Sequence, residues 1–248
     1  MSGMIIYGVP FSQPVRAVLW LLMLKKEAFE LVLTNPGSSG PGGSRHSDFL
    51  LKNPGGTIPC LEEPETGFTL GEAHAIMTYL AQKNAWNDVY PTDLRIRGRI
   101  DAFLHFHHRN FREASLGLVA PKVRKDLNIP ETVQASAHRS LSAALKMLDG
   151  SVLSNAQFLV GDAMTLADLA AYVEIGQLQP EFTNIFDFSG YPNVQRWMSD
   201  MKGVDGHDDV HVALTELGDI SERAPDIEQI KQANRRALGA IKARLEGL

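Results

Sequence analysis

The spacing of apolar residues changes along the chain, and its first part alternates strand-like and helix-like segments. Residues 4–8 and 29–33 are rich in residues that favour strands, whereas 14–26 has apolar residues at helical spacing. This order predicts a strand–helix–strand unit. A loop rich in Gly, Ser and Pro follows at 35–44, and after it we expect a short helix around Asp48.

The next segment predicts two strands and a helix. Residues 59–63 and 68–70 have strand character and flank a turn at 64–67, and the helical spacing of 72–83 follows directly. Residues 1–84 are therefore expected to form one small α/β domain with the element order strand, helix, strand, strand, strand, helix, plus the short helix near Asp48.

Beyond the connection at 86–91 the pattern is helical, with few strand signals. We expect helices at 95–119, 131–149, 165–179, 191–203 and 225–247. The fold class predicted from the pattern is thus a small α/β domain followed by an all-helical domain over 95–248. The last helix, 225–247, is amphipathic, which is more typical of a packing element than of a membrane binder.

Composition narrows the class of protein. The 248 residues are 44% hydrophobic and have a formal net charge of −5, so a nucleic acid is an unexpected partner. The longest apolar run near the start, 17–24, is too short to span a bilayer, and no signal-peptide pattern follows it. Cys60 is the only cysteine and cannot form an internal disulfide. We therefore expect a cytoplasmic protein that does not bind membranes.

Common catalytic motifs are absent, but the segment Phe-Ser-Gln-Pro at 11–14 suits an anion site. The sequence has no Gly-x-Gly-x-x-Gly, Walker A, His-Glu-x-x-His or Cys-x-x-Cys motif. Pro14 favours the first helical position, which puts Ser12 just ahead of a positively polarised helix start. A hydroxyl there can hydrogen-bond an anion and, with the helix dipole, lower the pKa of a bound thiol. The alternative is that Ser12 and Gln13 only cap the helix.

Two further segments could dock a peptide. Pro59 opens a strand after a turn, and a cis Ile58–Pro59 bond would turn the Ile58 backbone outward; a trans bond at an edge strand is the alternative. Glu72 precedes another helix, whose first amides could hold a carboxylate. If Ser12, Ile58 and Glu72 converge on one sheet edge, the site fits an extended, anionic peptide with a free amine.

These motifs carry a resemblance to a known family. Ser-Gln-Pro-x-Arg-Ala at 12–17 is similar to the theta class of the glutathione transferases, and the resemblance extends over nearly the whole chain. Residues 90–95 and 97–104 resemble the start of that family's helical domain. The segment 161–168 resembles its internal capping motif, with Thr165 and Asp168 closing a helix start. The resemblance implies a thioredoxin-like N-terminal domain, an all-α C-terminal domain and a homodimer.

The resemblance also implies roles for individual residues. Ser12 would donate a hydrogen bond to the glutathione sulfur, Ile58 would pair its backbone with the cysteinyl unit, and Glu72 would meet the γ-glutamyl amine. The remaining expected contacts with glutathione are Gln13, Arg45, His46, Thr57, Pro59 and Ala73. Two positions depart from the theta pattern: Thr57 stands where Lys is common, and Ala73 stands where Ser is expected.

Histidines gather at two places in the helical part. His107 falls on the apolar stripe of the helix at 95–119, which predicts a core histidine. The side chains expected away from that stripe are His105, His108, Arg109 and Arg112, and we place His108 and Arg112 at the electrophile pocket. No metal is expected, because no acidic or cysteine ligand accompanies them. His207 and His211 are expected at a solvated helix start, next to Gly203 and Gly206.

The function that the resemblance implies is glutathione transfer. Glutathione thiolate would attack a small hydrophobic electrophile, with peroxidase activity as a side reaction, glutathione as co-substrate and no other cofactor. The helix at 225–247 would act as a lid. One alternative is a non-catalytic module that uses the same fold for protein interaction. Another is a serine hydrolase, although Ser12 lies outside a nucleophile elbow.

Overall fold

The computed structural model describes residues 3–247, and its first part contains one mixed four-stranded sheet. The strands are β1 (Ile5–Gly8), β2 (Glu30–Leu33), β3 (Cys60–Glu63) and β4 (Phe68–Gly71), in the spatial order β2-β1-β3-β4. β1 runs parallel to β2, while β3 runs antiparallel to both β1 and β4. All four strands lie where the apolar pattern predicted them.

The pairing register places several chain turns at one end of the sheet. Gly8 pairs with Leu33, and Cys60 pairs with both Tyr7 and Gly71. The carboxyl ends of β1, β2 and β4 therefore meet the amino end of β3. We call this end of the sheet the site edge, because the segments that contain Ser12, Ile58 and Glu72 all leave the sheet or enter it there.

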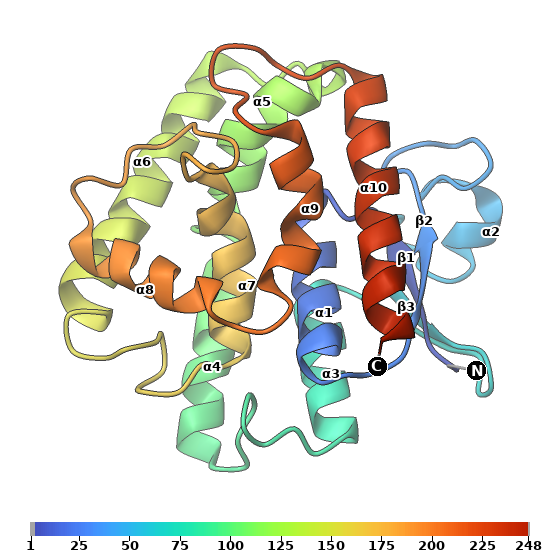
Figure 1. The fold of residues 1–248 in the computed structure, drawn as a ribbon, viewed down its shortest axis with the longest axis horizontal. Helices are drawn as coiled ribbons and strands as arrows, with labels where there is room; N and C mark the ends of the chain where they lie inside the picture. The colour runs from blue at the N-terminus through green and yellow to red at the C-terminus, as the bar shows by residue number, and fades with distance from the viewer. Residues whose placement is uncertain (1–2, 248) are drawn as a thin grey trace.

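Three helices accompany the sheet: α1 (Gln13–Leu24), α2 (Ser47–Leu50) and α3 (Ala73–Lys83). α2 lies on the outer side of the sheet, whereas α1 and α3 lie between the sheet and the helical part (Figure 1). Almost every side chain of α1 is buried, because the helix contacts α3 on one side and helices of the second part on another. α1 is therefore a shared core element of both parts.

The second part is helical, as predicted, with two differences. Its elements are α4 (Leu94–His107), π-helix η1 (Ala114–Val119), α5 (Ala120–Val123), 3₁₀-helix η2 (Lys125–Leu127), α6 (Glu131–Met147), π-helix η3 (Leu148–Val152), α7 (Leu166–Ile175), 3₁₀-helix η4 (Gly176–Leu178), α8 (Pro192–Lys202), α9 (His207–Leu217) and α10 (Ile227–Glu246). The helix expected over 95–119 is interrupted after His107, where Arg112 N–H bonds the His107 carbonyl. The helix α9 was not predicted in full.

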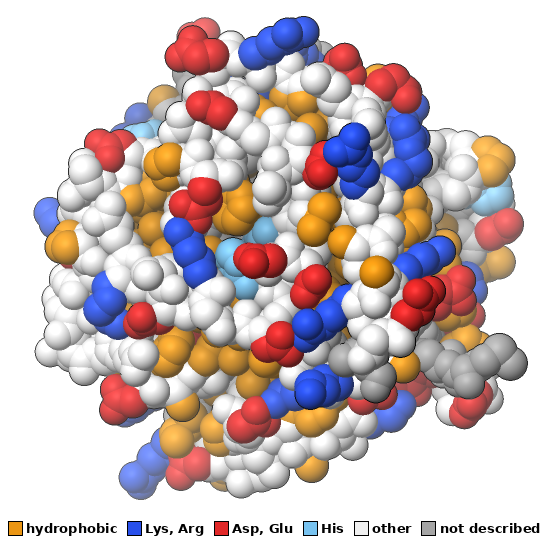
Figure 2. All heavy atoms as spheres, viewed as in Figure 1, with side chains coloured by type: hydrophobic (Ala, Val, Ile, Leu, Met, Phe, Trp, Pro, Cys, Tyr) orange, Lys and Arg blue, Asp and Glu red, His pale blue; other side chains and the backbone are white. Residues whose placement is uncertain are grey.

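The distribution of charge on the surface agrees with the similar numbers of basic and acidic residues in the sequence, 24 and 29. On the face shown in Figure 2, acidic and basic side chains are interspersed rather than gathered into one large patch of single sign. Ion pairs tie α10 to the chain before it: Arg236 pairs with Glu216, and Arg244 pairs with Asp205 and Asp209. Within residues 3–247, no helix is long and apolar enough to cross a membrane.

The expectation that His207 and His211 are solvated is wrong. Their exposed fractions are 6% and 1%, and both rings pack against Trp20, with centroid distances of 5.6 and 5.5 Å. His207 also contacts the Tyr172 hydroxyl at 2.8 Å, and His211 stacks on Phe182. Burial therefore lowers the pKa of both histidines. The nearby glycines suggested exposure, but aromatic partners distant in sequence cover this helix start.

The predicted capping motif at 161–168 is confirmed. The carboxylate of Asp168 is fully buried and accepts the N–H of Thr165 at 2.9 Å and the hydroxyl of Thr165 at 3.0 Å. It also accepts from Leu159 N–H at 2.9 Å and from the Trp197 indole at 3.0 Å. One side chain thus begins α7 and joins it to α8.

We expect Asp168→Ala to be strongly destabilising. It removes the acceptor for four buried donors, and we expect the free energy of unfolding to fall by more than about 3 kcal/mol. Urea denaturation followed by circular dichroism measures the change. Asp162→Ala, at an exposed position of the same segment, is the matched control and should change the value by less than about 0.5 kcal/mol. A loss below about 1 kcal/mol in Asp168→Ala would contradict this role.

Candidate functional site

Ser12 stands at the beginning of α1 with its hydroxyl unused by the helix. It is the N-cap residue, with extended backbone angles (φ −73°, ψ 125°), and its side chain forms no hydrogen bond to the first-turn amides. Ser12 is half-buried and Pro14 lies in the first turn, as the sequence predicted. Simple capping therefore does not account for the Ser12 hydroxyl, which can donate to an anion at the positive end of the helix dipole.

A buried cation lies behind Ser12. Arg16, one turn along α1, is 0% exposed, and its Nη1 donates to the Phe11 carbonyl at 2.5 Å. Burial lowers the pKa of Arg16 to about 9, so the guanidinium stays charged at neutral pH. Its charge adds to the helix dipole at Ser12, and both favour an anion there over a neutral ligand.

Hydrogen bonds between buried polar groups join this helix start to the second part of the molecule. Gln13 donates to the Gln177 carboxamide at 2.7 Å, and Gln177 in turn donates to the Ser115 hydroxyl at 3.0 Å. Ser115 donates to the fully buried carboxylate of Glu174, which also pairs with Arg112 at 2.8 Å. Gln13 thus directs its side chain toward the second part, and Arg112 is connected to it through three side chains.

The second predicted segment, before β3, exposes its backbone at the site edge. Of the two alternatives for the Ile58–Pro59 peptide bond, the structure has the cis bond. Ile58 is half-buried, and none of the hydrogen bonds found among residues 3–247 involves its backbone. The side-chain carboxamide of Asn53 fixes the loop before Ile58 by donating to the Thr57 carbonyl at 2.8 Å. The Ile58 backbone is therefore available to an extended ligand.

Arg45 lies against the same loop. A Cβ added to Gly56, whose φ is +60°, would come within 2.9 Å of the Arg45 Cδ, so the arginine side chain passes directly over this glycine. His46, the next residue, caps α2 by accepting the Asp48 N–H at 3.4 Å. His46 also lines a cavity of about 200 Å³ between β2, the following loop and α2. The structure thus brings Arg45 near Thr57 and directs His46 toward α2.

Glu72 has an unusual backbone conformation at the start of α3. Its φ is +65°, a region that non-glycine residues rarely adopt, and its side chain forms no capping bond to α3. The Glu72 carboxylate is exposed, and the amides that open α3 at Ala73 are not capped by it. A carboxylate and a helix start thus stand side by side, a combination that can bind an amine and a carboxylate of one ligand.

The histidine cluster lies next to this helix start. His74, the second residue of α3, has its ring 4.5 Å from His107 and 5.0 Å from His108. His107 is buried as predicted, and its Nε2 is 3.7 Å from Glu174. His105, His108 and Arg109 are exposed, whereas Arg112, expected away from the buried stripe, turns inward to Glu174. His108 therefore lies near the start of α3, and Arg112 belongs to the adjoining buried network.

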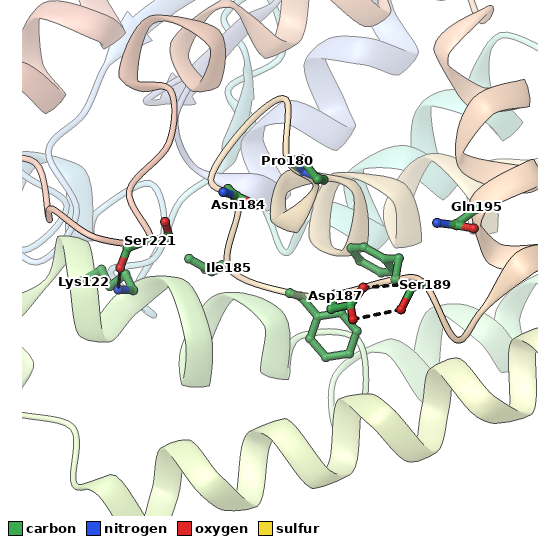
Figure 3. A pocket seen from close by; sticks show the side chains of 10 residues that line it. Lys122, Pro180, Asn184, Ile185, Asp187, Ser189, Gln195 and Ser221 are labelled. Atoms are coloured by element: carbon green, nitrogen blue, oxygen red, sulfur yellow. Dashed lines mark hydrogen bonds between the residues drawn. The ribbon is translucent and has the colours of Figure 1, made fainter.

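A cavity of about 620 Å³ lies elsewhere, in the helical part. It is lined by Lys122, Pro180, Asn184, Ile185, Phe186, Asp187, Phe188, Ser189, Gln195 and Ser221, none of which was a predicted site residue. Figure 3 shows Asp187 bonded to Ser189, and Lys122 bonded to Ser221, so its charged groups are already paired within the chain. The chemistry of the site edge does not extend to this cavity.

Several residues that organise the site were missed from the sequence. Glu174 and Gln177 are polar residues in the otherwise apolar run of α7 and η4, and a buried polar network is the usual reason for such a placement. Asn53 begins an Asn-Pro-Gly-Gly turn, a signal that could have identified it. Asn234 interrupts the apolar stripe of α10 in the same way as Glu174 interrupts α7.

Comparisons with known proteins agree on one family. Residues 6–87 match the family model "Glutathione S-transferase, N-terminal domain", and residues 104–203 match "Glutathione S-transferase, C-terminal domain". Human glutathione S-transferase theta-1 is 30% identical over 236 residues, which cover 92% of this chain and 95% of the relative. The apo structure of human glutathione-S-transferase T1-1 superposes with a TM-score of 0.73 at 26% identity, over 96% of this chain and 99% of that chain. A glutathione S-transferase structure from Pseudomonas fluorescens superposes with a TM-score of 0.70 at 26% identity, over 83% and 98% of the two chains.

The buried histidines predict a loss of stability in acid. Burial lowers the pKa of His107 to about 3, whereas its pKa in the unfolded chain is about 6.5. Between these values the unfolded state binds the proton and the folded state does not, so the free energy of unfolding falls as the pH falls. We expect His107→Phe to reduce this slope by about 1.4 kcal/mol per pH unit between about pH 6 and pH 4.

Urea denaturation at a series of pH values measures this slope. His105→Phe, at an exposed position of the same helix, is the control and should keep the parent slope. Equal slopes in His107→Phe and the parent protein would show that His107 is not the neutral buried group described above.

Proposed function

Because the chain belongs to the glutathione transferase family, we propose that it transfers the glutathione thiolate to a small hydrophobic electrophile. The observation that supports this most is the free hydroxyl of Ser12 at the start of α1, with the buried charge of Arg16 behind it. In the proposed reaction the thiol loses its proton to solvent, and the sulfur forms a bond to an electrophilic carbon. The leaving group departs with its electron pair, and Ser12 donates a hydrogen bond without becoming the nucleophile.

The proposed glutathione site follows the site edge. The backbone of Ile58 beside Pro59 would pair with the cysteinyl unit, and the carboxylate of Glu72 would meet the γ-glutamyl amine. The first amide of α3, at Ala73, would receive the γ-glutamyl carboxylate. This assignment is supported by the cis bond, by the free backbone of Ile58 and by the exposed Glu72 carboxylate.

The remaining contacts are proposed around these three points. Arg45, which lies over Gly56, and His46 would face the glycyl carboxylate, with Thr57 beside them. Because the Gln13 side chain donates to Gln177, its proposed role is to fix the helix start after Ser12. Glutathione is the co-substrate, and the proposal requires no metal or other cofactor.

The second substrate is proposed to bind between α3 and the helical part, beside α4. His108 would line this electrophile pocket, which is supported by its ring contact with His74 at the start of α3. Arg112, which pairs with the buried Glu174, would line the pocket with the exposed part of its side chain. α10 would act as a lid that limits access for bulky substrates. The same thiolate could reduce an organic hydroperoxide as a side reaction. We also propose a cytoplasmic location.

The alternative is a non-catalytic protein-interaction module with this fold. The departures from the theta pattern at Thr57 and Ala73 favour it, because both lie in the proposed glutathione site. Titration calorimetry with glutathione separates the two functions: the enzyme binds glutathione, and the interaction module does not.

We expect Ser12→Ala to impair chemistry far more than binding. If Ser12 and the helix start together lower the thiol pKa by about two units, they contribute about 2.7 kcal/mol, of which the hydroxyl supplies a large share. Conjugation at neutral pH should fall by about tenfold or more, while the Kd of glutathione changes by less than about threefold. Ultraviolet absorbance of the thiolate reports the thiol pKa of bound glutathione.

Two variants make this experiment specific. Ser12→Thr keeps a hydroxyl and should retain part of the shift in thiol pKa, whereas Ser199→Ala, at an exposed position of α8, should behave like the parent protein. An unchanged thiol pKa in Ser12→Ala would refute the proposed role of Ser12.

We further propose a homodimer, supported by exposed apolar side chains on β4 and at the start of α4. Leu94 is 81% exposed, and Phe68 and Ile96 are each 38% exposed. Burial of such residues against a second copy would remove apolar surface from water. Light scattering at micromolar concentration should give twice the chain mass of 27.3 kDa. A monomer mass at that concentration would contradict this part of the proposal.

A further inference from the structure

The C-terminal helix contacts the loop that presents Ser12. α10 begins with a capping box formed by Asp226 and Gln229 and packs along α9 (Figure 1). Its buried face consists of Ala233, Asn234, Ala237 and Ile241. Three of these four side chains are apolar, so the carboxamide of Asn234 needs polar partners within the packed interface.

Both polar atoms of Asn234 are engaged. Its Oδ1 accepts the backbone N–H of Phe11 at 2.8 Å, and its Nδ2 donates to the Ile230 carbonyl one turn earlier in α10 at 3.0 Å. The bond to Ile230 fixes the orientation of the carboxamide, and the oxygen is the only atom of this group that can accept from Phe11. The contact joins two residues that are 223 positions apart in the chain.

This bond and a second one, to the Phe11 carbonyl, hold Phe11, the residue before Ser12. The loop from Val9 to Ser12 has few backbone donors of its own, since Pro10 lacks an N–H group. Phe11 donates its N–H to Asn234 and accepts from Arg16 through its carbonyl, and Ser12 is the next residue. The position of the Ser12 hydroxyl therefore depends on a side chain from the last helix.

We propose that Asn234 is a positioning residue, which holds Phe11 so that the Ser12 hydroxyl meets the sulfur of bound glutathione. The effect on glutathione rests on the proposed function; the effect on the loop does not. α10 is more than a lid in this proposal, because it completes the geometry of the site. The ion pairs of Arg236 and Arg244 and the buried Ala237 and Ile241 keep α10 in place, so that Asn234 acts from a fixed support.

The first experiment tests the loop without glutathione. Hydrogen exchange at the Phe11 amide, followed by nuclear magnetic resonance, should become about tenfold faster in Asn234→Leu and Asn234→Ala, which remove the acceptor. Asn234→Asp keeps an acceptor oxygen and should stay close to the parent rate. Gln232→Leu, at an exposed position of the same helix, is the matched control. Parent-like exchange in both the Leu and the Ala variant would overturn the proposal.

The second experiment separates positioning from simple stabilisation. In Asn234→Leu, or in Asn234→Ala if the leucine variant does not fold, the thiol pKa of bound glutathione should rise by about half a unit or more. The kcat for conjugation at neutral pH should fall by about threefold or more, with the Kd of glutathione within about twofold of the parent value. A purely structural asparagine would lower the melting temperature and leave the thiol pKa and kcat unchanged, and that result would overturn the proposal. If the parent protein itself fails to bind glutathione, the proposed function is refuted, and Phe11 exchange alone then decides whether Asn234 holds the loop.

Discussion

The burial of the Arg16 charge is the constraint on which the arrangement of the two parts depends. A fully buried guanidinium is costly unless its donors are paired, and α1 alone does not offer enough acceptors. Arg16 therefore donates to Phe11 in the loop before α1 and to Val173 on α7, at 2.5 and 3.1 Å. Separating the two parts would leave this charge without its partner on α7. The contact between the parts is thus set by an electrostatic requirement as well as by apolar packing.

The same constraint explains why Ser12 has a free hydroxyl. The backbone of the loop is satisfied by other groups: Arg16 donates to the Phe11 carbonyl, Asn234 accepts the Phe11 N–H, and Ser12 N–H bonds to Val9. Since these bonds hold the loop, the Ser12 side chain is not needed to cap the helix. The Ser12 hydroxyl, which forms no hydrogen bond to the first turn of α1 at the positive end of this helix, is available for a ligand. The site therefore depends on residues from both parts of the chain, because Asn234, which holds Phe11, comes from the helical part.

The sequence predicted what depends on local pattern and missed what depends on distant partners. Strand alternation, Pro14 at a helix start and Asp168 in a capping motif are local signals, and each lies where it was expected. His211 was misplaced because its surroundings are Trp20 and Phe182, and local spacing does not identify such neighbours. The bonds of Glu174 and Asn234 were missed for the same reason. Polar residues on apolar faces indicate that a partner exists, but only the fold determines which one.

The departures at Thr57 and Ala73 bear on charge and side-chain contacts more than on the backbone of the site. The loop that presents Ile58 is held by Asn53, which donates to the Thr57 carbonyl, and by the positive φ of Gly56. The bond to the carbonyl and the φ of Gly56 do not involve the exposed side chain at position 57, although Asn53 Nδ2 also donates to the Thr57 hydroxyl at 3.3 Å. Ala73 likewise presents the first amide of α3, whatever side chain it has. In the proposed site, a tripeptide paired with the backbone would therefore find the same backbone donors and acceptors as in a chain with Lys and Ser at these positions. The protein lacks the Lys ammonium and the Ser hydroxyl, so under the proposed function the expected consequence of the two departures is weaker glutathione binding and not a displaced sulfur.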